Sequence, residues 1–198
     1  MNRIAAFVVT AAMAGMVGFA PASLFAQASG GKPPASERPL ASEKNPPGDI
    51  PDNQVFLEYR SPLGFNIKVP EGWARREASD GVTFSDKYNT IALAVSQRAD
   101  AISVVNAKQQ EVVDLEKTGR AVRVTGVKSV KLPSGPAVAV SYSSNSEPNP
   151  VTDKAIREEN DRYFFWQNGK LVTLTMSAPL GADNADQWDL MAKSFRWQ

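Results

Sequence analysis

Short stretches of alternating apolar and polar residues dominate the chain after residue 53. The clearest is 65–69, in which Phe65, Ile67 and Val69 occupy every second position. Alternation with a period of two predicts a β-strand that buries one face. Related patterns predict further strands at 55–59, 81–85, 91–95, 121–132 and 137–142.

The pair Asn168-Gly169 lies between two strongly apolar segments. Both residue types tolerate a positive φ, so the pair predicts a two-residue type I′ hairpin turn. Trp166 then pairs with Leu171, and Phe165 with Val172. One face of the hairpin carries Tyr163, Phe165, Val172, Leu174 and Met176, and the other carries Phe164, Trp166, Leu171, Thr173 and Thr175. Because both faces are apolar, we expect a sheet that is covered on both sides.

Two segments show helical periodicity. The first spans about 103–117, begins after Asp100 or Ser103 as N-cap and ends near Gly119. Its apolar stripe comprises Ile102, Val105, Val112 and Leu115. The second begins at Asn184-x-x-Gln187, which resembles a capping box, and places Ala185, Trp188, Met191 and Ala192 on one face. The predicted class is α+β: an α/β/α sandwich with a central, mainly antiparallel sheet flanked by two helices.

The N-terminus has the three parts of a secretory signal peptide: Arg3, an uncharged run at 4–20, and Ala26-Gln27-Ala28. We expect cleavage near Ala28, export to the periplasm or beyond, and no membrane span afterwards. An uncleaved N-terminal anchor is the alternative. Residues 29–52 are rich in Pro, Gly, Ser and charge, which predicts a flexible linker. The folded domain is then 53–198.

The composition limits the kinds of active site and partner that we expect. The 198 residues include no histidine and no cysteine. These types supply most nucleophile–base pairs, most transition-metal sites and all thiol redox chemistry, so we expect a protein without a cofactor that is not an enzyme. The net charge of +1 offers no basic excess for phosphates and argues against nucleic acid as a partner.

Three motifs occur together in a fixed order: Gly64-Phe65-x-Ile67-x-Val69-Pro70-x-Gly72-Trp73, Arg162-Tyr163-Phe164-Phe165 before Asn168-Gly169, and Ser194-Phe195-Arg196-Trp197. This order resembles the PsbP-like superfamily. That superfamily includes the extrinsic PsbP subunit of photosystem II, exported bacterial relatives, LpqN-type lipoproteins and a nuclear-import factor that binds the GTPase Ran. The resemblance covers about 55–197 and implies an α/β/α sandwich with a binding role. The chain departs from the lipoprotein branch because it lacks a lipobox cysteine.

Two acidic clusters could ligate a hard cation through oxygen: Glu158-Glu159-x-Asp161 and Asp183-Asn184-x-Asp186-x-x-Asp189. A solvated strand edge explains the first more simply, and charges at a helix N-terminus explain the second. Ser141, Ser143, Ser144 and Ser146 could act as nucleophiles only with Lys131 or Lys154 as base, and no Ser-x-x-Lys spacing occurs here. The sequence therefore assigns no catalytic, cofactor or metal residue.

The aromatic residues Tyr163, Phe164, Phe165, Trp166, Trp73, Trp188 and Trp197 are expected mainly in the core, with a part lining a groove. Asn145–Val151 is a polar, Pro-containing segment suited to a contact loop. We therefore predict a non-catalytic exported binding or assembly module that docks on a protein partner in the cell envelope or on a membrane surface. A carrier or sensor of a small apolar or amphipathic ligand is the alternative, and a hydrolase ranks third.

Overall fold

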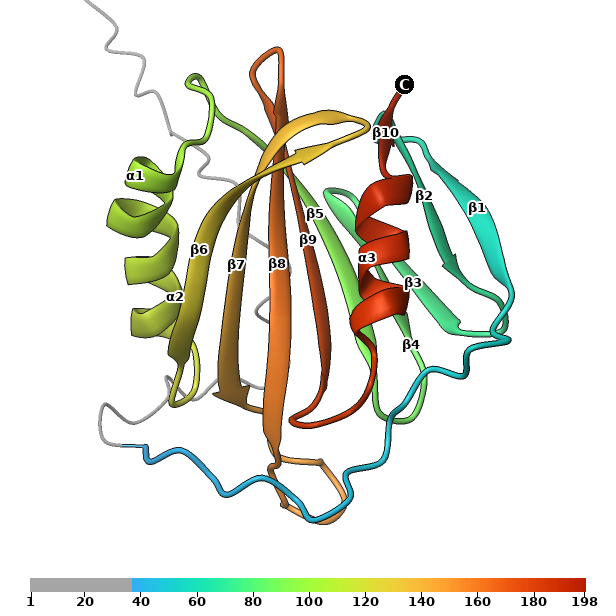
Figure 1. Ribbon diagram of the computed structural model, residues 1–198, viewed down its shortest axis with the longest axis vertical. Coiled ribbons are helices and arrows are strands. Elements are labelled where there is room, and N and C mark those ends of the chain that lie inside the picture. The colour runs from blue at the N-terminus through green and yellow to red at the C-terminus, as the bar shows by residue number, and fades with distance from the viewer. Residues whose placement is uncertain (1–36) are drawn as a thin grey trace, which may run out of the picture.

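The computed structural model describes residues 37–198, which form two antiparallel sheets and two helical segments (Figure 1). The larger sheet has seven strands in the order β3-β4-β5-β9-β8-β7-β6, and the smaller has three in the order β1-β2-β10. The strands are β1 Phe56–Ser61, β2 Phe65–Pro70, β3 Ala74–Ala78, β4 Gly81–Ser85, β5 Thr90–Gln97, β6 Arg123–Leu132, β7 Gly135–Asn145, β8 Arg157–Gln167, β9 Lys170–Pro179 and β10 Arg196–Trp197. The α+β class is confirmed, but two sheets take the place of the single central sheet that we expected.

The β8–β9 hairpin has the predicted register. Trp166 pairs with Leu171 and Phe165 with Val172, and the turn residues Asn168 and Gly169 have φ of 50° and 80°. The alternation of side chains about this turn therefore fixes which residues of the two long central strands share a face.

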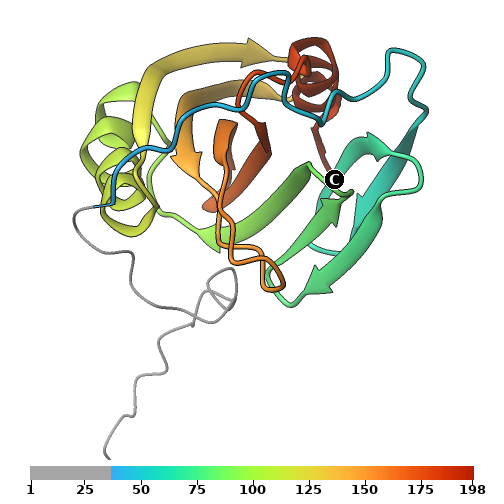
Figure 2. The same cartoon turned by 90° about the horizontal axis from the view of Figure 1, so that it is seen from below.

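The two faces of the seven-stranded sheet bury separate apolar clusters. On one face, which we call the α3 face, Phe165, Leu174 and Met176 pack with Trp188 and Met191 of α3 (Ala185–Ser194). The opposite face, the α2 face, buries Phe164, Val138 and Val140 with Ala107 and Leu115 from the first helical segment. Figure 2 shows the curved sheet with α1 and α2 to one side and α3 to the other.

The first helical segment runs continuously through α1 (Val104–Asn106), a π-helical turn η2 (Ala107–Glu111) and α2 (Val112–Thr118). Ser103 is the N-cap, as predicted, and forms a capping box with Asn106. The predicted stripe is wrong at Val105, which is 65% exposed. A π turn contains an extra residue relative to an α turn, so Val104 and Ala107, rather than Val105, face the sheet together with Val112.

Aromatic stacking joins the small sheet to the large one. Phe195, which follows α3 directly, stacks on Phe165 of β8 at a centroid distance of 4.0 Å and on Phe65 of β2 at 5.8 Å. Beyond it, β10 pairs with β2, with Trp197 opposite Phe65. The end of α3 is thereby held between the two sheets.

Residues 37–52 differ from the flexible linker that we expected, because they lie against the domain (Figures 1 and 2). Ile50 is 3% exposed and belongs to the cluster on the α3 face. Glu37 forms an ion pair with Arg120, and the backbone N–H of Leu40 donates to the side chain of Asn145. We call this segment the strap. The composition of the strap predicts that the entropy lost on ordering would keep it flexible. The burial of Ile50 and the specific polar contacts offset that loss.

The predicted signal peptide, residues 1–28, lies outside the described residues, as does the start of the predicted linker. Across 37–198, no helix combines the length and the apolar character needed to cross a membrane.

Candidate functional site

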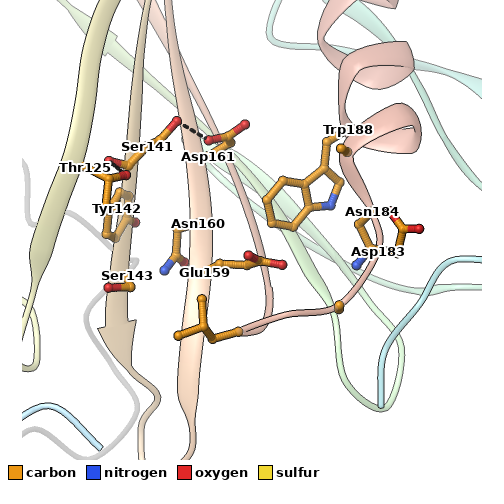
Figure 3. Close-up of a pocket in the computed structure, with 13 residues that line it drawn as sticks. Thr125, Ser141, Tyr142, Ser143, Glu159, Asn160, Asp161, Asp183, Asn184 and Trp188 are labelled. Carbon is orange, nitrogen blue, oxygen red and sulfur yellow. Dashed lines mark hydrogen bonds between the residues drawn. The ribbon is translucent and has the colours of Figure 1, made fainter. Parts of the chain in front are cut away.

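A cavity of about 530 Å³ opens on the α3 face, between β7 and β8 on one side and the start of α3 on the other (Figure 3). We call it the acidic cavity. Its polar lining includes Ser141, Ser143, Glu159, Asp161 and Asp183, and Trp188, Leu180 and Ala182 add apolar surface. Its volume falls within the range of sites that bind small molecules or side chains of a partner.

Strand alternation brings the polar residues of β7 and β8 together. Ser141 pairs with Asp161 and Ser143 pairs with Glu159 across the ladder, and residues two apart in a strand point to the same face. The Ser141 hydroxyl donates a hydrogen bond of 2.6 Å to Oδ1 of Asp161. The spacings Glu-x-Asp and Ser-x-Ser in the sequence are the signal for this shared face, but they do not show which other elements close the cavity.

The wall facing these strands comes from α3 and the turn before it. Trp188 is only 7% exposed, and Figure 3 shows its indole reaching from α3 toward β8. Asn184 is the N-cap residue, yet the predicted capping box is wrong, because its side chain makes no capping bond. Its amide instead accepts from the backbone N–H of Ile50 and donates to the carbonyl of Gly48. The strap therefore helps to position this wall.

Among the described residues, the negative charge of the cavity is not neutralised by any cationic side chain in its lining. Burial raises the pKa of Glu159, the backbone N–H of Gly181 lowers it, and the charges of Asp161 and Asp183 raise it again. Among the described residues, no lysine or arginine lines the cavity, and no ion pair involves these three carboxylates. The cavity thus favours a ligand that carries positive charge.

The two acidic clusters seen in the sequence do not form compact sites. Glu158 lies on the α2 face of β8, away from Glu159 and Asp161, and lines a different cavity. Asp189 forms an ion pair of 2.6 Å with Lys193 one turn along α3. Within 37–198, no group of three or more acidic residues is arranged to hold a metal ion.

A second cavity, of about 470 Å³, lies on the α2 face beyond the end of α2. Arg162 donates from Nε to Oγ1 of Thr175 and from Nη2 to the hydroxyl of Tyr142, at 2.9 and 3.2 Å. At the other end of this cavity, burial raises the pKa of Glu158 to about 7, and the charge of Glu147 acts in the same direction. Its charges are of both signs, in contrast to the acidic cavity.

The predicted serine candidates are divided between the two cavities. Ser141 and Ser143 line the acidic cavity, whereas Ser144 and Ser146 line the second. Neither Lys131 nor Lys154 lines either cavity, so the serines have no lysine as a base. The fold places two carboxylates, Glu159 and Asp161, in a common cavity.

The first residue of the predicted contact loop 145–151 is buried and holds other parts of the chain in place. Asn145 ends β7 and is 4% exposed, and its side chain donates to Glu37 and to the carbonyl of Arg38. Val151, by contrast, is 89% exposed. Asn145 therefore holds the strap, and only the residues that follow it are available for contact.

No protein-family model matches the sequence, and no curated protein sequence matches it. Solved structures do match. The solution structure of cyanobacterial PsbP (CyanoP) from Synechocystis sp. PCC 6803 has a TM-score of 0.55 at 14% identity, and the match covers 76% of this chain and 98% of that chain. The Ran-binding protein Mog1p of Saccharomyces cerevisiae has a TM-score of 0.52 at 14% identity, with 73% and 96% covered. LpqN of Mycobacterium tuberculosis has a TM-score of 0.46 at 16% identity, with 73% and 90% covered. The chain has the PsbP-like fold that its motifs predicted.

Proposed function

We propose that the chain is an exported, non-catalytic binding or assembly module that docks on a protein complex of the cell envelope or of a membrane surface. The observation that carries this proposal is the acidic cavity, which holds Glu159, Asp161 and Asp183 beside Trp188 without a counter-charge among the residues described. Uncompensated charge at a cleft is typical of surfaces that recognise a partner of opposite charge.

The shared fold supports a binding role. Mog1p is described as a Ran-binding protein, so this arrangement of strands and helices serves protein recognition in at least one other chain. The missing histidine and cysteine also reduce the means for catalysis.

Export rests on Arg3, the uncharged run 4–20 and Ala26-Gln27-Ala28. N-terminal sequencing of the protein recovered from outside the cytoplasm tests this part of the proposal and should give Ser29 or a neighbouring residue. A full-length chain in the membrane fraction would instead identify an N-terminal anchor.

Site-specific photo-crosslinking in the producing cells tests docking. Ala185 lines the acidic cavity and is exposed at its rim, so a benzoylphenylalanine at this position should crosslink to an envelope protein. The same group in place of the exposed Glu116 on α2 is the matched control and should give no such product. Equal products from both positions, or none from Ala185, would refute docking through this face.

The carrier alternative has one observation in its favour. A smaller cavity of about 310 Å³ lies beneath α1 and is lined mainly by apolar side chains, among them Ile102, Val104, Val138 and Trp166. It suits a small apolar ligand, and native mass spectrometry of the purified chain would reveal one that is retained. A hydrolase would depend on Glu159 and Asp161. If the purified chain hydrolysed an oligosaccharide and Glu159→Gln abolished that activity, hydrolysis would replace docking as the proposed function.

A further inference from the structure

The acidic cavity has a shape and charge that select among cations. Its three carboxylates come from separate positions: Glu159 and Asp161 on β8 and Asp183 before α3. In the described part of the chain these acids do not converge as a metal site does, and the cavity that they help to line has a volume of about 530 Å³. A compact ion would leave most of that space empty, whereas an elongated organic cation would fill it.

Trp188 is a second and independent feature of this cavity. Its side chain is more than nine-tenths buried yet lines the cavity. Its indole Nε1 is not among the buried polar atoms without a partner in residues 37–198, so this N–H stays accessible to solvent and can report on binding. An aromatic ring also attracts an ammonium or guanidinium group placed over its face. The cavity therefore combines an aromatic surface, from Trp188, with the carboxylates of its acidic residues.

We infer that the acidic cavity receives the side chain of a lysine or arginine presented by a partner protein, with Trp188 against its alkyl stem or cationic head and Glu159, Asp161 and Asp183 around its charge. This inference rests on the proposed docking function and names the chemistry that the partner must present. An aliphatic stem with a terminal charge matches a lining that is apolar at Leu180, Ala182 and Trp188 and negative at its other wall.

Other ligand classes fit less well. An anion would meet three carboxylates and no lining lysine or arginine among the described residues. Burial is the main cause of the raised pKa of Glu159, and repulsion from Asp161 and Asp183 adds to it. A neutral sugar would gain hydrogen bonds but would leave that repulsion in place. Only a cation relieves that repulsion as it binds.

The test titrates the purified chain with three capped tripeptides that differ only at the centre: acetyl-Gly-Lys-Gly-amide, acetyl-Gly-Arg-Gly-amide and acetyl-Gly-Gln-Gly-amide. Binding is followed by the indole N–H resonance of Trp188 in ¹H–¹⁵N NMR spectra, assigned with Trp188→Phe. We expect saturable shifts with the Lys or Arg peptide, at dissociation constants on the order of 1 mM or lower, that weaken as salt screens the charges. The Gln peptide should leave the resonance in place.

Variants locate the binding. Glu159→Gln combined with Asp161→Asn removes charge with little change in size and should weaken binding of the basic peptides at least tenfold. Glu116→Gln on the far side of α2 is the matched control and should bind as the unaltered chain does. If the double variant loses the dispersed spectrum of a folded chain, the peptide selectivity and salt dependence of the unaltered chain still decide the question.

The outcomes separate this inference from the docking function. Shifts of Trp188 with spermidine but with neither basic peptide would overturn a partner side chain in favour of a free polyamine. No shift with any of these probes, together with crosslinking from Ala185, would refute the basic side chain and leave docking intact. Binding of the basic peptides without crosslinking would support the cavity chemistry and refute docking in the cell.

Discussion

Replacing Glu158 with Gln should stabilise the protein at alkaline pH and leave it unchanged in acid. Glu158 is on the α2 face of β8, where it lines the second cavity. Burial raises its pKa to about 7, and the nearby charge of Glu147 contributes. The folded chain therefore holds the carboxyl proton more tightly than the unfolded chain does, so ionisation of this group opposes folding.

The magnitude follows from the change in pKa. Raising the pKa from 4.5 to about 7 corresponds to about 3 kcal/mol. The protonated carboxyl of Glu158 contributes this free energy to folding. The contribution is fully present below pH 4.5, falls as the pH rises toward 7, and is absent at pH 8. Glutamine has a similar size and no charge at any of these values. Glu158→Gln should therefore raise the free energy of unfolding by up to about 3 kcal/mol at pH 8 and by less than about 0.5 kcal/mol at pH 4.

Urea unfolding, followed by tryptophan fluorescence at pH 4, 6 and 8, measures this difference. Glu116→Gln removes an exposed carboxylate and should show no comparable dependence on pH. Glu147→Gln should reproduce part of the gain at pH 8, because it removes the second cause of the raised pKa. A Glu158→Gln variant whose stability relative to the unaltered chain is the same at pH 4 and pH 8 would refute the reasoning.

Two further predictions concern the fold. Gly169→Val places a β-branched residue at a φ of 80° and should lower stability by about 1–2 kcal/mol; an unchanged urea midpoint would contradict the type I′ turn. Ile50→Ala should cost about 2–5 kcal/mol because Ile50 is buried in the core of the α3 face, whereas Leu40→Ala, at a site 40% exposed, should change stability by less than about 0.5 kcal/mol. Equal effects of these two substitutions would mean that the strap does not pack in solution.

Local patterns predicted most of the strands, because alternation and turn chemistry act within a few residues. The β8–β9 register follows from Asn168-Gly169 alone. The strand β3 was missed because its sequence, Ala-Arg-Arg-Glu-Ala, is almost entirely exposed and lacks apolar alternation. It forms at the edge of the sheet because the backbone of β4 offers it a partner, which composition does not reveal.

Longer-range packing accounts for what the sequence did not predict. The strap is held by residues more than 100 positions away, such as Asn145 and Asn184. Likewise, spacing shows that Glu159 and Asp161 share a face, but only the return of α3 across β8 brings Asp183 and Trp188 opposite them. The acidic cavity is thus a product of tertiary structure, and no single motif encodes it.

The position of Phe195 between Phe65 and Phe165 has a consequence for synthesis of the chain. Gln198 bonds to the backbone of Phe65 across 133 positions, so a nascent chain cannot close this face until its residues near 195 have left the ribosome. Until then Phe65 and Phe165 lack their common partner, and exposed apolar surface of this kind favours aggregation. Folding of the α3 face therefore waits for the residues near 195 and is dominated by contacts of high sequence separation.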